Sequence, residues 1–129
     1  MLTVIKGRSD VPSGLAQGTF TGEAWRDTLL PPEDGVAVGN VFFAPCARTF
    51  WHSHVGGQLL IVLAGSGFVG DDKETVSVTA GDMVWTPPGV RHWHGARANR
   101  YLLHTAVTVG ETDWEDAVTD EVYAAAAQP

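Results

Sequence analysis

Two histidines, His52 and His54, stand two positions apart in a stretch with the composition of a β-strand. Side chains along a strand alternate between two faces, so both imidazoles are expected on one face. Two imidazoles on one face can bind a divalent metal ion, and Gln58 and His92 could complete a four-ligand site. An isolated pair of this kind is more often a pair of surface or core histidines, so the surrounding sequence has to decide.

Glycines and prolines around these residues indicate tight turns that hold strands in a fixed relation. Gly65 closes the segment with the histidine pair, and a second segment has marked residues at Gly81, Pro87, Gly89 and His92. The two segments resemble the two sequence motifs of the cupin superfamily. The resemblance implies an all-β, single-domain cupin fold, a double-stranded β-helix or jelly-roll barrel. It also implies one metal site with four ligands: His52, His54, Gln58 and His92.

Three positions depart from the cupin motifs. Gln58 stands where most metal-binding cupins have Glu, Cys46 stands at the opening Gly, and Ala96 replaces the closing Asn. Because Gly tolerates a positive φ and Cys does not, the turn at Cys46 must either differ or carry strain of order 1 kcal/mol. The side chain of Cys46 itself is expected to be a small buried hydrophobe.

Gln58 has an electrostatic consequence. Three neutral imidazoles and one neutral amide leave a divalent ion with its full positive charge, whereas Glu would reduce that charge. A more positive site disfavours an oxidised metal and favours Lewis-acid chemistry. The alternative, that Gln58 is a conservative exchange with the same role as Glu, stays open.

His104 is the candidate for proton transfer. It lies among apolar residues in the predicted strand 101–108, where a lone histidine would ordinarily be a core residue. Beside a metal, however, burial should keep the imidazole neutral and able to accept a proton. His94 shares the alternation of His92 and could also face the cavity, and Val41 and Phe43 are candidates for an apolar pocket. Trp51 and Trp93 are expected to pack on the outer face of the barrel wall.

A closer resemblance covers about residues 36–123. It is carried by 47–49, 57–58, 92–96, His104 and the ending 114–123. These segments are similar to a bacterial subgroup of small single-domain cupins that includes manganese-dependent hydroxynitrile lyases. The subgroup implies Mn as the favoured ion, with Fe, Ni or Zn as alternatives, and a general base or acid at His104. Small cupins also imply a homodimer or higher homo-oligomer.

Composition narrows the function further. With 129 residues there is room for one domain, and the formal charge of −7 with no basic cluster argues against nucleic acid. A single cysteine excludes an internal disulfide and fits a reducing compartment. The sequence contains neither a membrane-spanning run nor a signal peptide, so a cytoplasmic protein acting on a small molecule is expected, without a membrane partner.

The chain reads as short strands separated by turns. Residues 1–35 are expected to be an irregular N-terminal arm, with a strand at 19–21, that pairs with a neighbouring subunit. Residues 36–123 form the barrel and end in a capped helical turn, and 124–129 form a frayed tail. The strands are expected at 36–43, 50–54, 59–63, 67–70, 75–78, 83–86, 92–95 and 101–108.

Three functions follow from this site. The first is a lyase that cleaves or forms a cyanohydrin or a related carbon–carbon bond by Lewis-acid and general-base chemistry. The second is an iron- or nickel-dependent dioxygenase, against which the neutral ligands speak. The third is a cupin that binds a metal or small ligand without catalysis.

Overall fold

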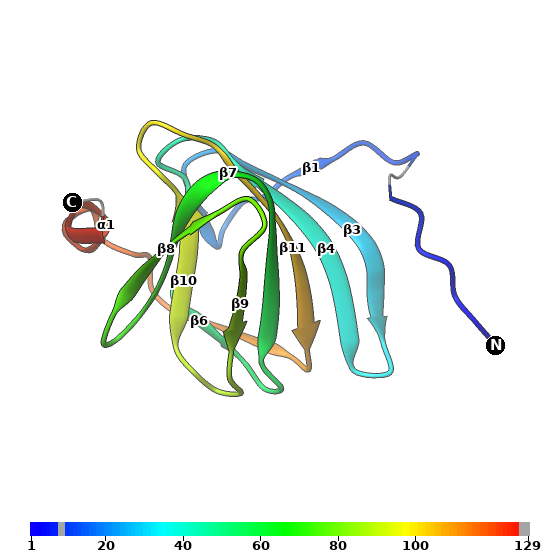
Figure 1. The fold of residues 1–129 in the computed structure, drawn as a ribbon. Coiled ribbons are helices and arrows are strands. Elements are labelled where there is room, and N and C mark those ends of the chain that lie inside the picture. The colour runs from blue at the N-terminus through cyan, green and yellow to red at the C-terminus, as the bar shows by residue number, and fades with distance from the viewer. Residues whose placement is uncertain (8–9, 127–129) are drawn as a thin grey trace.

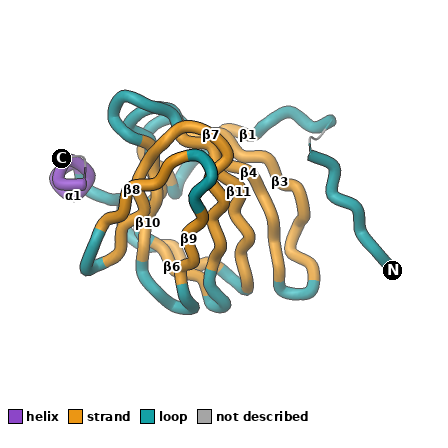
Figure 2. Tube along the Cα trace, in the orientation of Figure 1, coloured by secondary structure: helices purple, strands orange, loops and turns teal. Residues whose placement is uncertain are grey.

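Residues 1–7 and 10–126 are described by the computed structural model, and strands form most of it (Figures 1 and 2). The strands are β1 (Gly14–Leu15), β2 (Phe20–Thr21), β3 (Ala24–Glu33), β4 (Val36–Phe43), β5 (Arg48–Thr49), β6 (His52–His54), β7 (Gln58–Asp71), β8 (Thr75–Thr79), β9 (Met83–Thr86), β10 (His92–Ala96), β11 (Leu102–Val109) and β12 (Thr112–Trp114). A short helix, α1 (Asp120–Ala126), follows them. No helix in the described ranges is long and apolar enough to cross a membrane.

Two antiparallel sheets face each other and share β7. The first half of β7 pairs with β11 and β9, in a sheet that continues through β4 and β3 to β1. Its second half pairs with β8 and β10, in a sheet that also contains β2, β5, β6 and β12. The curled antiparallel sheet confirms the predicted all-β jelly-roll barrel, seen side-on in Figure 1.

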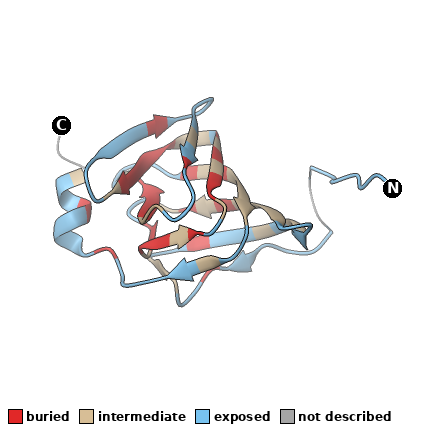
Figure 3. Ribbon diagram, turned by 90° about the horizontal axis from the view of Figure 1, so that it is seen from below, coloured by how far each residue is buried: buried red, intermediate tan, exposed pale blue. Residues whose placement is uncertain are grey.

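Buried residues concentrate on the strands of the barrel, while the surface of α1 is largely exposed (Figure 3). The main core, between the sheets, includes Phe43, Leu60, Val62 and Leu102. A second cluster lies outside the barrel wall, where α1 covers it: Trp51, Phe68, Trp93, Val118 and Tyr123. Trp51 and Trp93 therefore pack on the outer side of the wall, because they alternate with the inward-facing histidines of β6 and β10.

The sequence predicted a break between 63 and 67, but β7 is continuous across it. Gly65 has φ +77° there, and the register with β11 shifts between Leu103 and His104. Glycine adopts this conformation without a Cβ clash, so the strand bends and passes from one sheet to the other without ending. The two predicted strands are two halves of one.

The expectation of an irregular chain before Val36 is wrong for residues 24–33, which form the ten-residue strand β3. β3 pairs with β4 from Ala24↔Phe43 to Glu33↔Val36 and forms the long strand beside it. Its register shifts around Leu30 accommodate Pro31 and Pro32, beyond the short neighbour β1, where missing N–H donors cost little. The predicted strand at 19–21 corresponds to β2. Pairing of this N-terminal segment with a neighbouring subunit stays a prediction.

The C-terminal helix begins as expected. Val122 N donates to the side-chain oxygen of Thr119 at 3.2 Å, and Asp120 and Glu121 lie in the first turn. The hydroxyl of Tyr123 donates to the carbonyl of Ala96 at 2.6 Å, which attaches the helix to β10. The tail predicted from 124 is helical up to Ala126, and residues 127–129 lie outside the described residues.

Cys46 carries the strain that its position implied. Its φ is +73°, so the turn keeps the conformation that Gly would adopt more easily. The backbone is fixed there because Cys46 N donates to Arg97 O at 3.0 Å. The thiol is exposed, so the expectation of a buried Cys46 is wrong: its backbone bends the side chain away from the core.

Candidate metal centre and proton-transfer site

Three histidines of β6 and β10 meet in the interior of the barrel. His52 and His54 occupy alternate positions of β6, and His92 of β10 pairs directly with His52. Their ligand nitrogens all lie within 4.8 Å of one another, and all three side chains are buried. These residues form a group that could bind a metal ion.

The partners of the Nδ1 atoms orient the rings. His52 Nδ1 donates to Phe50 O at 2.8 Å and His92 Nδ1 donates to Val90 O at 3.0 Å, since a carbonyl can only accept. His54 Nδ1 lies 2.8 Å from Thr112 Oγ1. The two carbonyl contacts leave the Nε2 lone pairs of His52 and His92 for a ligand, and the Thr112 contact does the same for His54 when the hydroxyl oxygen accepts.

Gln58 joins this group from the start of β7. Its Nε2 donates to Thr108 Oγ1 at 2.9 Å, and its Oε1 lies 3.4 Å from His92 Nε2. With His92 Nδ1 protonated, both of these facing atoms are acceptors, and two acceptors repel unless a cation lies between them. His54 Nε2 is likewise buried without a hydrogen-bond partner in the described structure. The predicted ligands therefore converge, and their lone pairs fit a divalent ion.

Burial sets the charge of these rings. Desolvation, followed by repulsion from His92, lowers the pKa of His52 to about 2 and that of His54 to about 4. Desolvation also lowers the pKa of His92. The imidazoles are neutral at physiological pH, which is the form that binds metals.

His94 and His104 form a second, separate pair. His104 Nε2 and His94 Nδ1 are 2.9 Å apart, and the outer nitrogens, His94 Nε2 and His104 Nδ1, are buried without partners in the described residues. Whichever ring donates, one outer nitrogen carries a lone pair and the other carries a proton. The pair can thus accept a proton at one end and donate one at the other.

This histidine pair lies next to the ligand group and is also neutral. The ring centroids of His94 and His52 are 5.1 Å apart. Desolvation by full burial lowers the pKa of His104 to about 4 and that of His94 well below its usual value. Phe43 packs against both rings: its ring centroid lies 5.8 Å from that of His94 and 5.3 Å from that of His104.

A cavity of about 680 Å³ connects the two groups with the surface. Among the predicted pocket residues, Val41 and His94 line it, whereas Phe43 lies behind the histidine pair in the core. The inward faces of β3, β4 and β11 form one wall, and β5, β6, β10 and β12 form the other. Exposed lining residues on β3 and β12 place its open side between these two strands.

Sequence reasoning missed several lining residues. Phe20 and Trp114 form an aromatic edge, with ring centroids 6.2 Å apart, and Trp114 lies 4.5 Å from the ring of His52. Thr108 and Thr112, which hold Gln58 and His54, also went unnoticed. The alternation of β11 does place Thr108 on the face of His104, so that signal was available. Nothing local placed Phe20 or Trp114.

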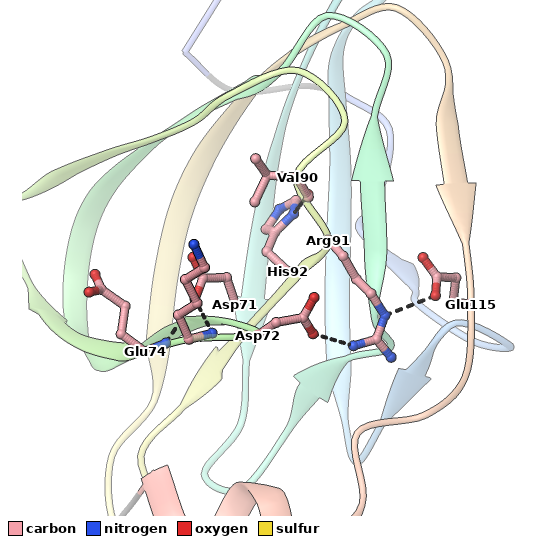
Figure 4. Close-up of polar contacts among 8 residues, drawn as sticks. Asp71, Asp72, Glu74, Val90, Arg91, His92 and Glu115 are labelled. Atoms are coloured by element: carbon pink, nitrogen blue, oxygen red, sulfur yellow. Dashed lines mark hydrogen bonds and ion pairs between the residues drawn. The ribbon is translucent and has the colours of Figure 1, made fainter.

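Arg91 fixes the entry of the chain into β10, as Figure 4 shows. Its guanidinium binds Asp72 and Glu115, each at 2.9 Å, and lies 3.9 Å from the ring centroid of Trp51. These contacts join the β7–β8 turn and the segment after β12 to the residue preceding His92. Arg91 therefore supports the position of a ligand without lining the cavity.

Residues 40–108 match the family model of the cupin domain. Together with the fold and the histidine group, this match shows that the chain belongs to the cupin family.

Proteins similar to this chain include enzymes. An (R)-mandelonitrile lyase of Granulicella tundricola is 41% identical over 111 residues, covering 81% of this chain and 85% of the relative. An acireductone dioxygenase of Sulfurihydrogenibium is 31% identical over 68 residues, with 50% and 38% covered. Among solved structures, a cupin-like protein of Thermotoga maritima has a TM-score of 0.86 at 36% identity, covering 94% of this chain and 98% of that one. This chain thus has a possible metal site and is similar to proteins with enzymatic activity.

Proposed function

We propose that this protein is a metal-dependent lyase that cleaves or forms a cyanohydrin or a related carbon–carbon bond. The observation that carries the proposal is the neutral His94–His104 pair, buried in the cavity beside the three-histidine group. A 41% identical mandelonitrile lyase supports the same reaction.

The ligands would be His52, His54, His92 and Gln58. A divalent ion held by them, with Mn favoured over Fe, Ni or Zn, supplies Lewis-acid stabilisation of an oxygen or of a leaving anion. Because all four ligands are neutral, the full charge of the ion stays available for that role.

His104 would take the proton of the substrate hydroxyl as the carbon–carbon bond breaks, releasing aldehyde and cyanide. His94 would hold His104 in the correct tautomer through their 2.9 Å contact. The apolar wall that includes Val41 and Ala106 excludes water from the reacting group.

The test is aldehyde release from mandelonitrile, without oxygen, by Mn-loaded wild type and His104→Ala at equal metal content. A base in this position contributes roughly 10²–10⁴-fold, so the variant should lose at least a hundredfold in rate. Added imidazole should restore part of the activity by filling the space left by the ring. Equal rates in wild type and variant would remove His104 from the mechanism.

A dioxygenase is the second candidate, favoured by the 31% identical acireductone dioxygenase. Oxygen consumption with an enolic substrate by the Fe- or Ni-loaded protein, and no cleavage of mandelonitrile, would replace the lyase with this activity. Metal binding with neither activity would favour the binding cupin.

A further inference from the structure

Arg26 stands apart from the other cationic residues of the protein. It lines the cavity, and no other Lys or Arg among the described residues does so. The ion pairs found in the described ranges involve Arg48 and Arg91, but not Arg26. Lys6, Lys73, Arg97 and Arg100 are also absent from these ion pairs, so what distinguishes Arg26 is its place in the cavity lining.

The sheet register places Arg26 in the same row as the proposed base. Arg26 of β3 pairs with Val41 of β4, and Val41 pairs with His104 of β11. Two strand spacings separate the Cα atoms of Arg26 and His104 by roughly 10 Å. All three side chains alternate onto the inward face, so Arg26 lies at the open side of the cavity and His104 lies deeper.

Aromatic rings connect the two positions. The Cζ of Arg26 lies 5.9 Å from the centroid of the Phe20 ring, and that ring lies 5.8 Å from Phe43. Phe43 is in turn 5.3 Å from His104. The contact with Phe20 orients the guanidinium while leaving its donors for a ligand.

Asp27 and Glu111 also belong to the cavity lining, but no ion pair in the described ranges joins either carboxylate to Arg26. Asp27 is the next residue of β3, and successive side chains of a strand point to opposite faces. Glu111 follows Gly110, whose N donates to Gly35 O at 2.7 Å at the far end of β4. Five residues of strand, about 16 Å, separate that end from Val41.

We propose that Arg26 binds a carboxylate of the substrate, so that the natural substrate is an anionic hydroxy or carbonyl compound. Its carboxylate would lie a few carbons from the carbon held between the metal centre and His104. The inference rests on the proposed function for the reacting end of the molecule. A carboxylate is favoured over a phosphate because one guanidinium matches a single planar anion, and no second Lys or Arg of the described residues lines the cavity.

The test is calorimetric titration of the Mn-loaded protein with 4-carboxybenzaldehyde and with benzaldehyde. Wild type should bind the carboxylated aldehyde at least about tenfold more tightly than benzaldehyde. Arg26→Gln should abolish this preference without changing the affinity for benzaldehyde. Arg26→Lys should keep part of the preference. Arg100→Gln, which changes an exposed arginine outside the cavity lining, should keep all of it.

Equal affinities in wild type, no detectable binding of the carboxylated aldehyde, or a preference that survives Arg26→Gln would each overturn the proposal. A preference that survives Arg26→Gln but disappears with chelation would place the carboxylate on the metal instead. Cleavage of mandelonitrile is measured separately. If cleavage fails while the Arg26-dependent preference persists, the lyase is wrong and the anion site stands.

Discussion

The hydrogen-bond partner of each histidine distinguishes the proposed metal ligands from the proposed proton carriers. All 5 histidines of the chain are buried. His52 and His92 donate from Nδ1 to a backbone carbonyl, which leaves Nε2 for a metal, and His54 Nδ1 lies beside a threonine hydroxyl that can accept in the same way. His94 and His104 instead bond to each other, so neither ring is committed to an outside acceptor.

Removing one ligand should abolish stable metal binding. In His52→Ala or His92→Ala, three remaining ligands no longer hold a labile divalent ion against dialysis. Metal content after dialysis measures this directly. His94→Ala is the matched control, since it also removes a buried histidine of β10 but should retain the metal; full occupancy in His92→Ala would contradict the ligand assignment.

Cys46 tests how much stability a positive φ costs at a residue that has a side chain. At φ +73°, Cys46→Gly should be more stable than Cys46→Ala by about 1 kcal/mol, because only the first relieves the strain. Both substitutions remove the thiol, so its loss cancels in the comparison. Urea unfolding of the two variants measures the difference, and equal midpoints would show that the turn relaxes around Ala.

At the scale of elements, β7 connects the site across the barrel. It carries Gln58 at its start, in the sheet with His104, and ends at Asp71, which pairs with His92 in the other sheet. The bend at Gly65 lets one strand serve both sheets. The spacing between Gln58 and Gly65 thus sets where β7 bends, and the bend lets β7 reach β10, which begins at His92 of the second motif.

Gly65 should tolerate no side chain. A Cβ there would lie 2.0 Å from the carbonyl oxygen of Tyr101, so Gly65→Ala should destabilise the fold by about 3 kcal/mol or more. Gly81→Ala is the control. An alanine at its φ of +96° would be similarly strained, but the new Cβ would meet nothing within 4 Å. Thermal unfolding compares the two variants. Equal losses of stability would mean that backbone strain, and not the clash with Tyr101, sets the cost of the substitution.

Local sequence patterns predicted the strands at Val36–Phe43 and Met83–Thr86 with their bounds, because alternation and flanking turns mark both. The convergence of His52, His54, Gln58 and His92 was implied by the resemblance to the two cupin motifs. β3 was not, because its prolines speak against a strand and only pairing with β4 stabilises it. Phe20 and Trp114 reach the cavity through the register of terminal strands, which no local pattern encodes.

At the scale of the whole molecule, the buried histidines make stability depend on pH. In the metal-free protein the pKa values of His54 and His104 are about 4, against 6.5 in the unfolded chain. Between these values the unfolded state binds more protons, so stability is retained above pH 6.5 and lost as pH falls toward 4. Each histidine contributes up to about 1.4 kcal/mol per pH unit.

Urea unfolding at pH 7.5, 6.5, 5.5 and 4.5 after chelation should show this loss. His104→Gln removes one titrating group and should give a shallower dependence. A dependence unchanged in that variant would mean that His104 does not contribute. Mn²⁺ in excess should raise the whole curve at neutral pH, because it binds only the folded state.

The contact between Trp114 and His52 makes the centre optically readable. The two ring centroids are 4.5 Å apart, whereas Trp93 lies in the cluster outside the wall. Unpaired electrons on a nearby ion quench the emission of an excited indole, and Zn²⁺, with its filled d shell, has none. Loading with manganese should therefore dim Trp114, and loading with zinc should leave it bright, so that the fluorescence intensity and lifetime of the protein would report which ion is bound.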